Sequence, residues 1–411
     1  MTIDEFAVTD PGHAAALDAA DPLASFRDRF VFADRELIYL DGNSLGRLPK
    51  ATEARLRDVI ATEWGGGLVR SWDEWLDLPL RVGDATASAV LGARPGEVVV
   101  SDSTTVNFYK LALAALDARP GRRTIVTDRD NFPTDRYVLE GLAAQRGLVF
   151  RWIDGDPIDG PQPRDVEAVL DEDVALVTLS HVNYRSAAIA DMRVITALAH
   201  DAGALALWDL SHAAGSVSVD LEGDGVDLAV GCTYKYLNGG PGAPAFLYVR
   251  TAVQGQLRNP IRGWFGRAEQ FEMAQGWTAR PGIASWLTGT PTIPAVAAVE
   301  EGVRLVGEAG IEAIRAKAVA LTTYAIELHD AWLAPLGFTL GSPRDAARRG
   351  AHVAVRRGDA RELCAALIRA GVVPDFREPD SIRLGLSPLT TSFGDVRSAI
   401  ERLRDLASGS A

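Results

Sequence analysis

Two short segments carry polar side chains of the kind that hold and activate a reactive amine. Residues 231–238 read Gly-Cys-Thr-Tyr-Lys-Tyr-Leu-Asn and place Lys235 just after an apolar run. Residues 208–212, Trp-Asp-Leu-Ser-His, end an earlier apolar run with Asp209 and His212. A lysine amine can bond covalently to an aldehyde, and a carboxylate can keep a ring nitrogen protonated. Pyridoxal phosphate (PLP), a pyridine aldehyde, needs this pair of groups to stabilise a carbanion at an amino-acid α-carbon.

Two further segments follow apolar runs and open predicted helices. Residues 102–107, Asp-Ser-Thr-Thr-Val-Asn, offer hydroxyls and free N–H groups that suit a phosphate, although an ordinary N-cap explains them equally well. Residues 131–135 read Asn-Phe-Pro-Thr-Asp. Phe132 is placed to stack on a flat ring and Asp135 to hydrogen-bond a ring substituent. The alternative is an ordinary proline-containing turn.

Each remaining candidate also has a simpler interpretation. A lone lysine such as Lys235 is usually a surface charge, Asp209 can cap a helix, and His212 can be a packing residue. Tyr234 is suited to donating to a phosphate or moving a proton. Arg383, in the sequence Ser-Ile-Arg-Leu-Gly, could bind a substrate carboxylate through two parallel hydrogen bonds from its planar guanidinium. An internal salt bridge is a serious alternative for this arginine.

Short apolar runs alternate with helical patterns from residue 97 onward. Because these runs show little polar alternation, we expect strands covered on both faces, and hence a mostly parallel α/β sheet. Seven strands are predicted, at 98–100, 124–126, 148–150, 175–179, 204–208, 228–231 and 245–249. The candidate residues lie just beyond such runs, where open α/β sheets bind their ligands.

The chain of 411 residues is longer than one ordinary core supports, so two domains are expected. We predict an N-terminal segment at 1–50, with a helix beginning near Asp21 and a short strand at 38–40, and a large PLP-binding domain at 51–290. Residues 291–411 are expected to form a linking helix and a small α+β domain.

Composition excludes several classes of function. The formal net charge of −13 and the lack of a basic block disfavour nucleic-acid binding. The sequence has no uninterrupted run of about 18 apolar residues, so a membrane span is not predicted. The first residues lack the pattern of a signal peptide, and a cytoplasmic location is therefore expected. Two cysteines and six histidines without close pairs disfavour a disulfide framework or a metal site.

Taken together, these motifs resemble those of kynureninases, PLP enzymes of the aminotransferase-like fold type I. The resemblance spans roughly residues 38 to 400 in the expected order. It is carried by segments 42–46, 102–107, 131–135, 180–186, 208–212, 234–242, 263–266 and 289–291. It implies PLP as cofactor, a homodimer, and hydrolysis of the Cβ–Cγ bond of L-kynurenine to anthranilate and L-alanine.

The resemblance also assigns roles to single residues. Lys235 matches the lysine that forms the Schiff base, Asp209 the partner of the pyridine nitrogen, and Tyr234 a phosphate contact that also moves protons. Further matches on the cofactor side are Thr104, Thr105 and Thr290, the stacking Phe132, the ring contacts Asp135 and His212, and Trp264, a phosphate contact from the other subunit. On the substrate side, Arg383 matches the α-carboxylate clamp, and Asn43 is expected nearby.

Two positions depart from the family pattern. Arg267 stands where the family usually has histidine, and Thr390 where it often has tyrosine. Both are expected near the substrate, so a ring-modified kynurenine or another γ-keto amino acid is a hypothesis for the natural substrate. A cysteine desulfurase or lyase is a weaker alternative, because Cys232 and Cys364 both read as structural. An inactive homologue is weaker still, since the expected site residues are complete.

Overall fold

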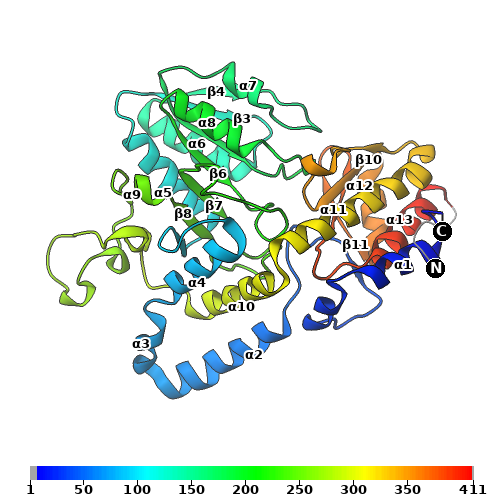
Figure 1. Ribbon diagram of the computed structural model, residues 1–411, viewed down its shortest axis with the longest axis horizontal. Coiled ribbons are helices and arrows are strands. Elements are labelled where there is room, and N and C mark those ends of the chain that lie inside the picture. Colours follow the sequence, from blue (N-terminus) through cyan, green and yellow to red (C-terminus); the bar gives the residue numbers. More distant parts are fainter. Residues whose placement is uncertain (1–6, 410–411) are drawn as a thin grey trace.

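The computed structural model describes residues 7–409 and contains a large sheet and a small sheet, each with its own helices (Figure 1). The large sheet has seven strands, and only β8 runs antiparallel to its neighbours. Across the sheet the strands are β2 (Val98–Val100), β8 (Phe246–Val249), β7 (Leu228–Gly231), β6 (Leu205–Asp209), β5 (Val174–Ser180), β3 (Thr124–Asp128) and β4 (Val149–Ile153).

Both faces of the large sheet are covered, as the apolar runs predict. On β6, Leu205 and Leu207 pack into one core and Ala206 and Trp208 into the other, because successive side chains of a strand point to opposite faces. The first core contains α5 (Thr104–Asp117) and α6 (Pro133–Arg146). The second contains α4 (Leu78–Thr86), α8 (Met192–Asp201) and α10 (Ile293–Ala309). The shorter helices α7 (Pro163–Glu167) and α9 (Thr251–Gln254) lie at the periphery (Figure 1).

The small domain is an antiparallel sheet covered by helices, so the predicted fold class is confirmed. Its strand order is β12 (Asp375–Arg377), β13 (Ser381–Gly385), β10 (His352–Arg356) and β9 (Thr339–Leu340). The core beside this sheet is built from α1 (Pro11–Ala20), α11 (Ile311–Leu328), α12 (Ala360–Arg369) and α13 (Phe393–Ala407). Helices α10 and α11 follow one another and lead from the large domain into the small one (Figure 1).

The N-terminal segment contributes to both cores. Ala14 and Leu40 belong to the small-domain core, whereas Leu23 and Phe30 belong to the large one. Strand β1 (Ile38–Tyr39) pairs in parallel with β11 (Val372–Val373). The domain boundaries expected at residues 50 and 290 remain predictions.

No α-helix begins at Asp21, contrary to expectation. Helix α1 ends at Ala20, and only a short 3₁₀ helix, Ala24–Arg29, follows. The Asp21 carboxylate accepts a hydrogen bond from the Leu23 N–H (2.9 Å) and pairs with the buried Lys317 ammonium (2.6 Å). This long-range ion pair fixes a turn that local sequence cannot reveal.

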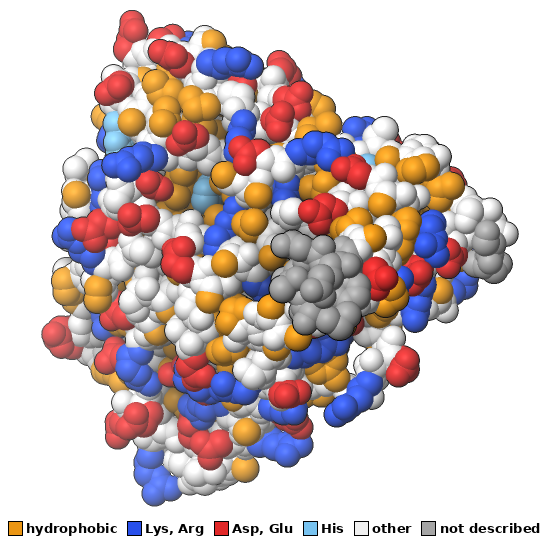
Figure 2. Space-filling view, turned by 45° about the vertical axis from the view of Figure 1, so that its right-hand side comes forward, with side chains coloured by type: hydrophobic (Ala, Val, Ile, Leu, Met, Phe, Trp, Pro, Cys, Tyr) orange, Lys and Arg blue, Asp and Glu red, His pale blue; other side chains and the backbone are white. Residues whose placement is uncertain are grey.

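An arm connects the N-terminal segment to the large domain. It consists of α2 (Lys50–Asp58), a π-helical segment at Val59–Gly67, a 3₁₀ turn at Leu68–Ser71 and α3 (Trp72–Trp75). The arm extends below the rest of the molecule in Figure 1. Among the helices within residues 7–409, none combines the length and apolar character needed to cross a bilayer. Figure 2 shows acidic and basic side chains interspersed over the face that it draws.

Candidate functional site

Lys235 lies on the turn that follows β7 and is 8% exposed. Its Nζ is 3.2 Å from Nε2 of His212, which lies on the turn after β6. The two turns are held together because the N–H of Cys232 donates to Oγ of Ser211 (3.1 Å). Neighbouring strands of the sheet thus bring a lysine and a histidine 23 residues apart into hydrogen-bond distance.

Lys235 opens onto a cavity that collects most of the residues expected to bind the cofactor. The cavity lies at the carboxyl ends of β2, β3, β6 and β7, where an open α/β sheet binds its ligand. Its lining residues are Thr104, Thr105, Phe132, Thr134, Asp135, Asp209, Ser211, Tyr234 and Lys235. Thr134 and Ser211 were not predicted, although each sits within a motif that was singled out.

Two carboxyl groups meet in this cavity. Asp135 is buried, and its desolvation together with the adjacent Asp209 raises the Asp135 pKa well above its ordinary value. Asp209 accepts a hydrogen bond from the N–H of Ser211 (2.8 Å). Among the described residues, Oδ2 of Asp135 has no hydrogen-bond partner. A buried polar atom without a partner is costly, so this pair is suited to receiving a polar group from a ligand.

The groups around Lys235 are held in defined protonation states. Burial, and next the charge of Lys235, lower the pKa of His212 well below its ordinary value, so the imidazole is neutral. Burial raises the pKa of Tyr234, which keeps its phenol protonated. The ring centroid of Phe132 is 5.7 Å from Nζ of Lys235. A neutral imidazole, a phenol and an aromatic face therefore surround the amine.

The N-terminus of α5 forms one end of the cavity. Ser103 is the N-cap, and its Oγ accepts from the N–H of Val106 (3.3 Å), so the capping interpretation is right for this residue. Thr104 and Thr105 form the first turn and line the cavity. The first N–H groups of a helix have no intrahelical acceptor and carry a partial positive charge. This end of the cavity is suited to a phosphate group.

Arg383 is 1% exposed and bonded within the small domain. Its guanidinium pairs with Asp375 through Nε (2.9 Å) and Nη2, and Nη2 also donates to Oγ of Ser44 (3.1 Å). Nη1 donates to the carbonyl of Tyr184. The salt bridge considered as an alternative therefore exists. Asp375 faces Arg383 directly in the β12–β13 hairpin, so an acid eight residues upstream across a turn at 378–380 was the available signal.

The turn at 42–46 joins Arg383 to the lysine. With its amide oxygen toward Arg383, Asn43 accepts hydrogen bonds from Nε (2.8 Å) and Nη2 (3.1 Å). At the other end of the turn, the N–H of Gly46 donates to the carbonyl of Tyr234 (2.7 Å). A Cβ on Gly46 would lie 2.3 Å from the carbonyl oxygen of Lys235, so only glycine fits there. The expected carboxylate clamp and the lysine turn are thus held by one short segment.

Three residues expected to contact the cofactor do not line this cavity: His212, whose Nε2 lies 3.2 Å from Nζ of Lys235, and Trp264 and Thr290. Trp264 packs edge-on against Phe265, with ring centroids 4.6 Å apart. Thr290 borders a separate hollow together with Asp102 and Thr288. The expected contact of Trp264 with a phosphate of the other subunit remains a prediction.

The two positions that depart from the family pattern engage other groups. The guanidinium of Arg267 donates to the carbonyls of Ala268 (2.8 Å) and Glu269 on its own loop. Thr390 is buried, and its carbonyl accepts from Nη1 of Arg27 (2.9 Å). Neither residue lines the Lys235 cavity in this chain, and their contact with substrate remains a prediction.

The residues present fit PLP. The lining of one cavity includes an amine, a carboxyl pair with an unpartnered oxygen, an aromatic ring near the amine, and a helix N-terminus. Within residues 7–409 there is no group of three or more His, Cys, Asp or Glu side chains that could hold a metal ion.

Known proteins are similar to this chain in sequence and in fold. The model of the kynureninase C-terminal domain matches residues 314–403. A kynureninase from Pseudomonas fluorescens is 44% identical over 407 residues, covering 97% of this chain and 96% of its own. The chain belongs to the kynureninase family. A kynureninase from Burkholderia pseudomallei (strain 1106a) is also 44% identical, over 96% of this chain and 94% of its own.

Solved structures place the kynureninase-family chain in the fold of PLP enzymes. The apo cysteine desulfurase from Thermococcus onnurineus NA1 superposes with a TM-score of 0.81 at 18% identity, covering 96% of this chain and 98% of its own. A mutant of C-DES, with glycine covalently linked to its PLP cofactor, gives 0.82 at 17%, covering 92% and 99%. Such low identity shows the fold alone.

Neither cysteine of this kynureninase-family chain is placed for desulfurase chemistry. Cys232 and Cys364 are both buried, and burial raises the pKa of each thiol, that of Cys364 to about 11. A desulfurase needs an exposed thiol that is readily deprotonated. The prediction that both cysteines are structural is confirmed.

Proposed function

We propose that this protein is a kynureninase that uses PLP to hydrolyse the Cβ–Cγ bond of L-kynurenine, giving anthranilate and L-alanine. The observation that carries the proposal is the 42–46 turn, which contacts both the Lys235 turn and the Arg383 guanidinium. A substrate that reacts at an amine-bearing carbon beside a carboxylate needs these two groups at a fixed separation.

Different residues of the chain bind the substrate, hold the cofactor and transfer protons. When bound, PLP withdraws electrons from the α-carbon of the amino acid joined to it. Arg383 binds the α-carboxylate through Nη1, which carries two N–H groups and donates, among the described residues, only to the carbonyl of Tyr184. Nζ of Lys235 would take the proton from the α-carbon of the bound amino acid. Asp209 would hold the ring nitrogen of PLP.

Hydrolysis also needs protons to be moved at the γ-carbonyl and the β-carbon. The phenol of Tyr234 borders the same cavity as Lys235, and burial keeps its Oη protonated. We assign it as a proton carrier beside the lysine. His212, neutral and within 3.2 Å of Nζ, orients the amine by hydrogen bonding.

The test is to record the absorbance of PLP-loaded protein and then the fluorescence of anthranilate after addition of L-kynurenine. We expect a visible Schiff-base band and rapid anthranilate release. Lys235→Ala should abolish both, whereas Lys50→Ala, which removes an exposed lysine, should change neither. Full turnover by Lys235→Ala would overturn the assignment.

The range of substrates is a separate question. Comparing kcat/KM across ring-substituted kynurenines tests whether Arg267 and Thr390 shift the preference away from the unsubstituted ring. A clear preference for plain L-kynurenine would reject a modified natural substrate. Sulfide release from cysteine would instead support desulfurase chemistry.

We infer that the protein acts as a homodimer and in the cytoplasm. Support for the dimer comes from Trp264 and Thr290, which are matched to cofactor contacts yet lie outside the cavity of their own chain. The cytoplasmic location rests on the sequence pattern alone, and cell fractionation tests it.

A further inference from the structure

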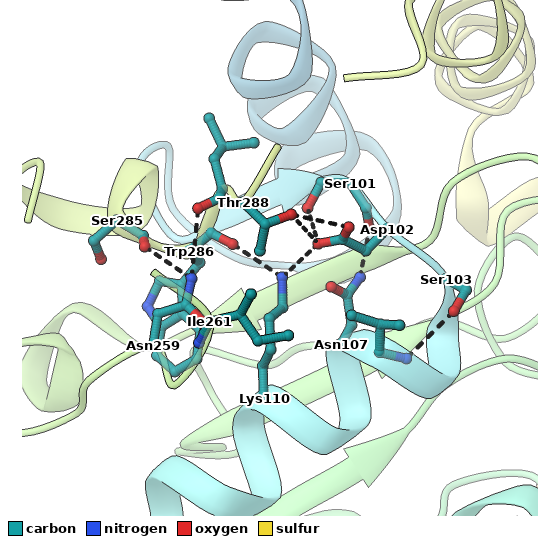
Figure 3. A network of polar contacts seen from close by, with 12 residues as sticks. Ser101, Asp102, Ser103, Asn107, Lys110, Asn259, Ile261, Ser285, Trp286 and Thr288 are labelled. Carbon is teal, nitrogen blue, oxygen red and sulfur yellow. Dashed lines mark hydrogen bonds and ion pairs between the residues drawn. The ribbon is translucent and has the colours of Figure 1, made fainter. Parts of the chain in front are cut away.

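A buried lysine on α5 has no role in the chemistry described above. Lys110 is 0% exposed and lies on the helix whose first turn carries Thr104 and Thr105. Its Nζ donates to Oδ2 of Asp102 (2.8 Å) and to the carbonyl of Trp286 (2.9 Å). Figure 3 shows the ammonium group pointing between these two acceptors. Burying an ammonium ion is costly unless it is paired and hydrogen-bonded, so these contacts are needed for the helix to pack.

The partner carboxylate lies at a strained point of the backbone. Asp102 has a φ of +53°, in the left-handed region, on the turn from β2 into α5. Its carboxylate also accepts from the hydroxyl of Thr288 (3.1 and 3.2 Å). Strained residues persist where their surroundings hold them. The bonds from Lys110 and Thr288 therefore fix the turn that directs the N-terminus of α5 toward the cavity.

Asp102 also poses an electrostatic problem for the proposed ligand. Asp102 stands two residues before Thr104 in the chain, and it borders the hollow that also contains the N-cap Ser103, whereas Thr104 lines the Lys235 cavity. An unpaired negative charge next to the N-terminus of α5 would weaken the attraction of that end for a phosphate dianion, whereas a paired carboxylate has a smaller effect. Lys110 supplies the compensating positive charge from inside the protein, so the helix end keeps its attraction for anions.

The same network holds a second segment. The carbonyl of Thr288 accepts from the N–H of Phe265 (3.1 Å), and a Cβ on Gly263 would lie 2.0 Å from that carbonyl oxygen. The side-chain amide of Asn259 donates to the carbonyl of Ser285 (3.0 Å). The segment that carries Trp264 is therefore packed on the stretch of chain that Lys110 and Asp102 bind (Figure 3).

We propose that the Lys110–Asp102 ion pair positions the binding site for the cofactor phosphate. The pair fixes the N-terminus of α5 relative to the 259–290 segment, and Lys110 neutralises the charge of Asp102. The proposal rests on the proposed function, since it takes PLP as the ligand. Lys110 acts through Asp102 and α5 and does not itself touch the ligand.

Comparing PLP with pyridoxal, which lacks the phosphate, isolates this role. Cofactor-free protein is titrated with each compound, and the Schiff-base absorbance gives the two dissociation constants. Lys110→Met should weaken PLP binding about tenfold and leave pyridoxal binding within about twofold of wild type. An unchanged ratio of the two constants overturns the proposal.

The chain offers a matched control in Lys317, which forms a buried ion pair with Asp21 in the small domain (2.6 Å). Lys317→Met should lower the melting temperature without changing the PLP-to-pyridoxal ratio. An equal change of the ratio in Lys317→Met would show that loss of any buried pair has this effect, and would also overturn the proposal.

Two further variants keep the test decisive if Lys110→Met folds poorly. Thr288→Val removes one hydrogen bond to Asp102 without unpairing a charge, and should weaken PLP alone by about threefold. The double variant Lys110→Met/Asp102→Asn removes both charges and should recover part of the PLP affinity. Failure of the wild-type protein to bind either compound would overturn the proposed function as well, whereas an unchanged ratio with normal wild-type binding overturns only this inference.

Discussion

Asp135 and Asp209 bring two carboxyl groups into the Lys235 cavity, although the pyridine nitrogen of PLP needs only one carboxylate as its partner. Burial, and next the neighbouring Asp209, raise the pKa of Asp135 well above its ordinary value, so in the cofactor-free protein this carboxyl keeps its proton to a higher pH than an exposed aspartate does. With the pyridine ring bound, we expect Asp209 to serve as the partner of the ring nitrogen and Asp135 to hydrogen-bond a ring substituent.

The raised pKa of Asp135 predicts how stability depends on pH in the cofactor-free protein. The unfolded chain loses this proton near pH 3.8 and the folded chain loses it at higher pH. Between these two pKa values, each unit by which the pH rises therefore lowers the free energy of unfolding by at most about 1.4 kcal/mol. Asp135→Asn has no carboxyl to lose this proton and can donate to Asp209, so its melting temperature should rise relative to that of the wild type as the pH is raised above 3.8. Parallel curves for the two proteins would contradict the prediction.

Most of the site residues could be predicted because they follow apolar runs that become strands. Lys235, His212 and Asp135 needed no more than the rule that parallel strands end at one edge. The partner of Arg383 was harder, because Asp375 is placed by the register of a hairpin whose first strand has only three residues. Lys110 was missed because a charged residue within a helix gives no sign that it is buried.

Helix α10 packs directly on the turn that carries the reactive lysine. A Cβ on Gly302 would lie 1.9 Å from the carbonyl oxygen of Leu237, two residues beyond Lys235. Glycine costs about 1 kcal/mol relative to alanine inside a helix, so close backbone approach is the physical reason for its presence here. The position of Lys235 therefore depends on a helix that contributes no polar group to the cavity.

Adding one methyl group at this contact should displace the lysine turn. We expect Gly302→Ala to lower the free energy of unfolding by about 1–3 kcal/mol and to weaken PLP binding, because the clash is with backbone. Gly307→Ala on the same helix is the matched control. Its Cβ would lie 3.4 Å from Cβ of Ala89, so this change should be neutral or stabilising. Denaturant titration gives the free energy of unfolding of both variants, and PLP titration gives their dissociation constants. Equal changes in Gly302→Ala and Gly307→Ala would reject the close-contact explanation.

At the scale of elements, the sequence predicted the long apolar strands and the short strand at 38–40, which is β1, and missed other short strands. All seven strands of the large sheet lie where the apolar runs stand, with ends that differ by up to three residues. The missed strands β9 and β11 have two residues each, and their pairing is set by tertiary contacts rather than by a local pattern. The helix expected at Asp21 failed for a similar reason, since Lys317 fixes that turn from elsewhere in the chain.

The whole molecule carries an apolar surface that a single chain leaves in water. On the arm, Ile60, Trp64, Leu68 and Val69 are exposed, Trp64 to 61% and Val69 to 76%. Phe271 and Met273, on the loop that follows Trp264, are exposed as well. Large exposed apolar side chains that cluster on one element mark interaction surfaces. The homodimer inferred above would bury them and would bring Trp264 close to the cavity of the partner chain.

A charge placed on the arm should therefore separate the subunits. Trp64→Glu is expected to reduce the mass measured by light scattering from that of two chains to that of one chain of 43.9 kDa, because an unpaired carboxylate in an apolar interface is costly. PLP binding should weaken in the same variant if Trp264 of each chain completes the site of the other.

Tyr137 supplies the control, since it is 64% exposed but lies on α6, far from the arm in Figure 1. Tyr137→Glu adds the same charge to an equally exposed aromatic position and should leave mass and PLP binding unchanged. Dissociation by Trp64→Glu with unaltered PLP affinity would mean that each chain binds its cofactor alone. A dimer that survives Trp64→Glu would place the interface elsewhere and leave the exposed arm for another partner.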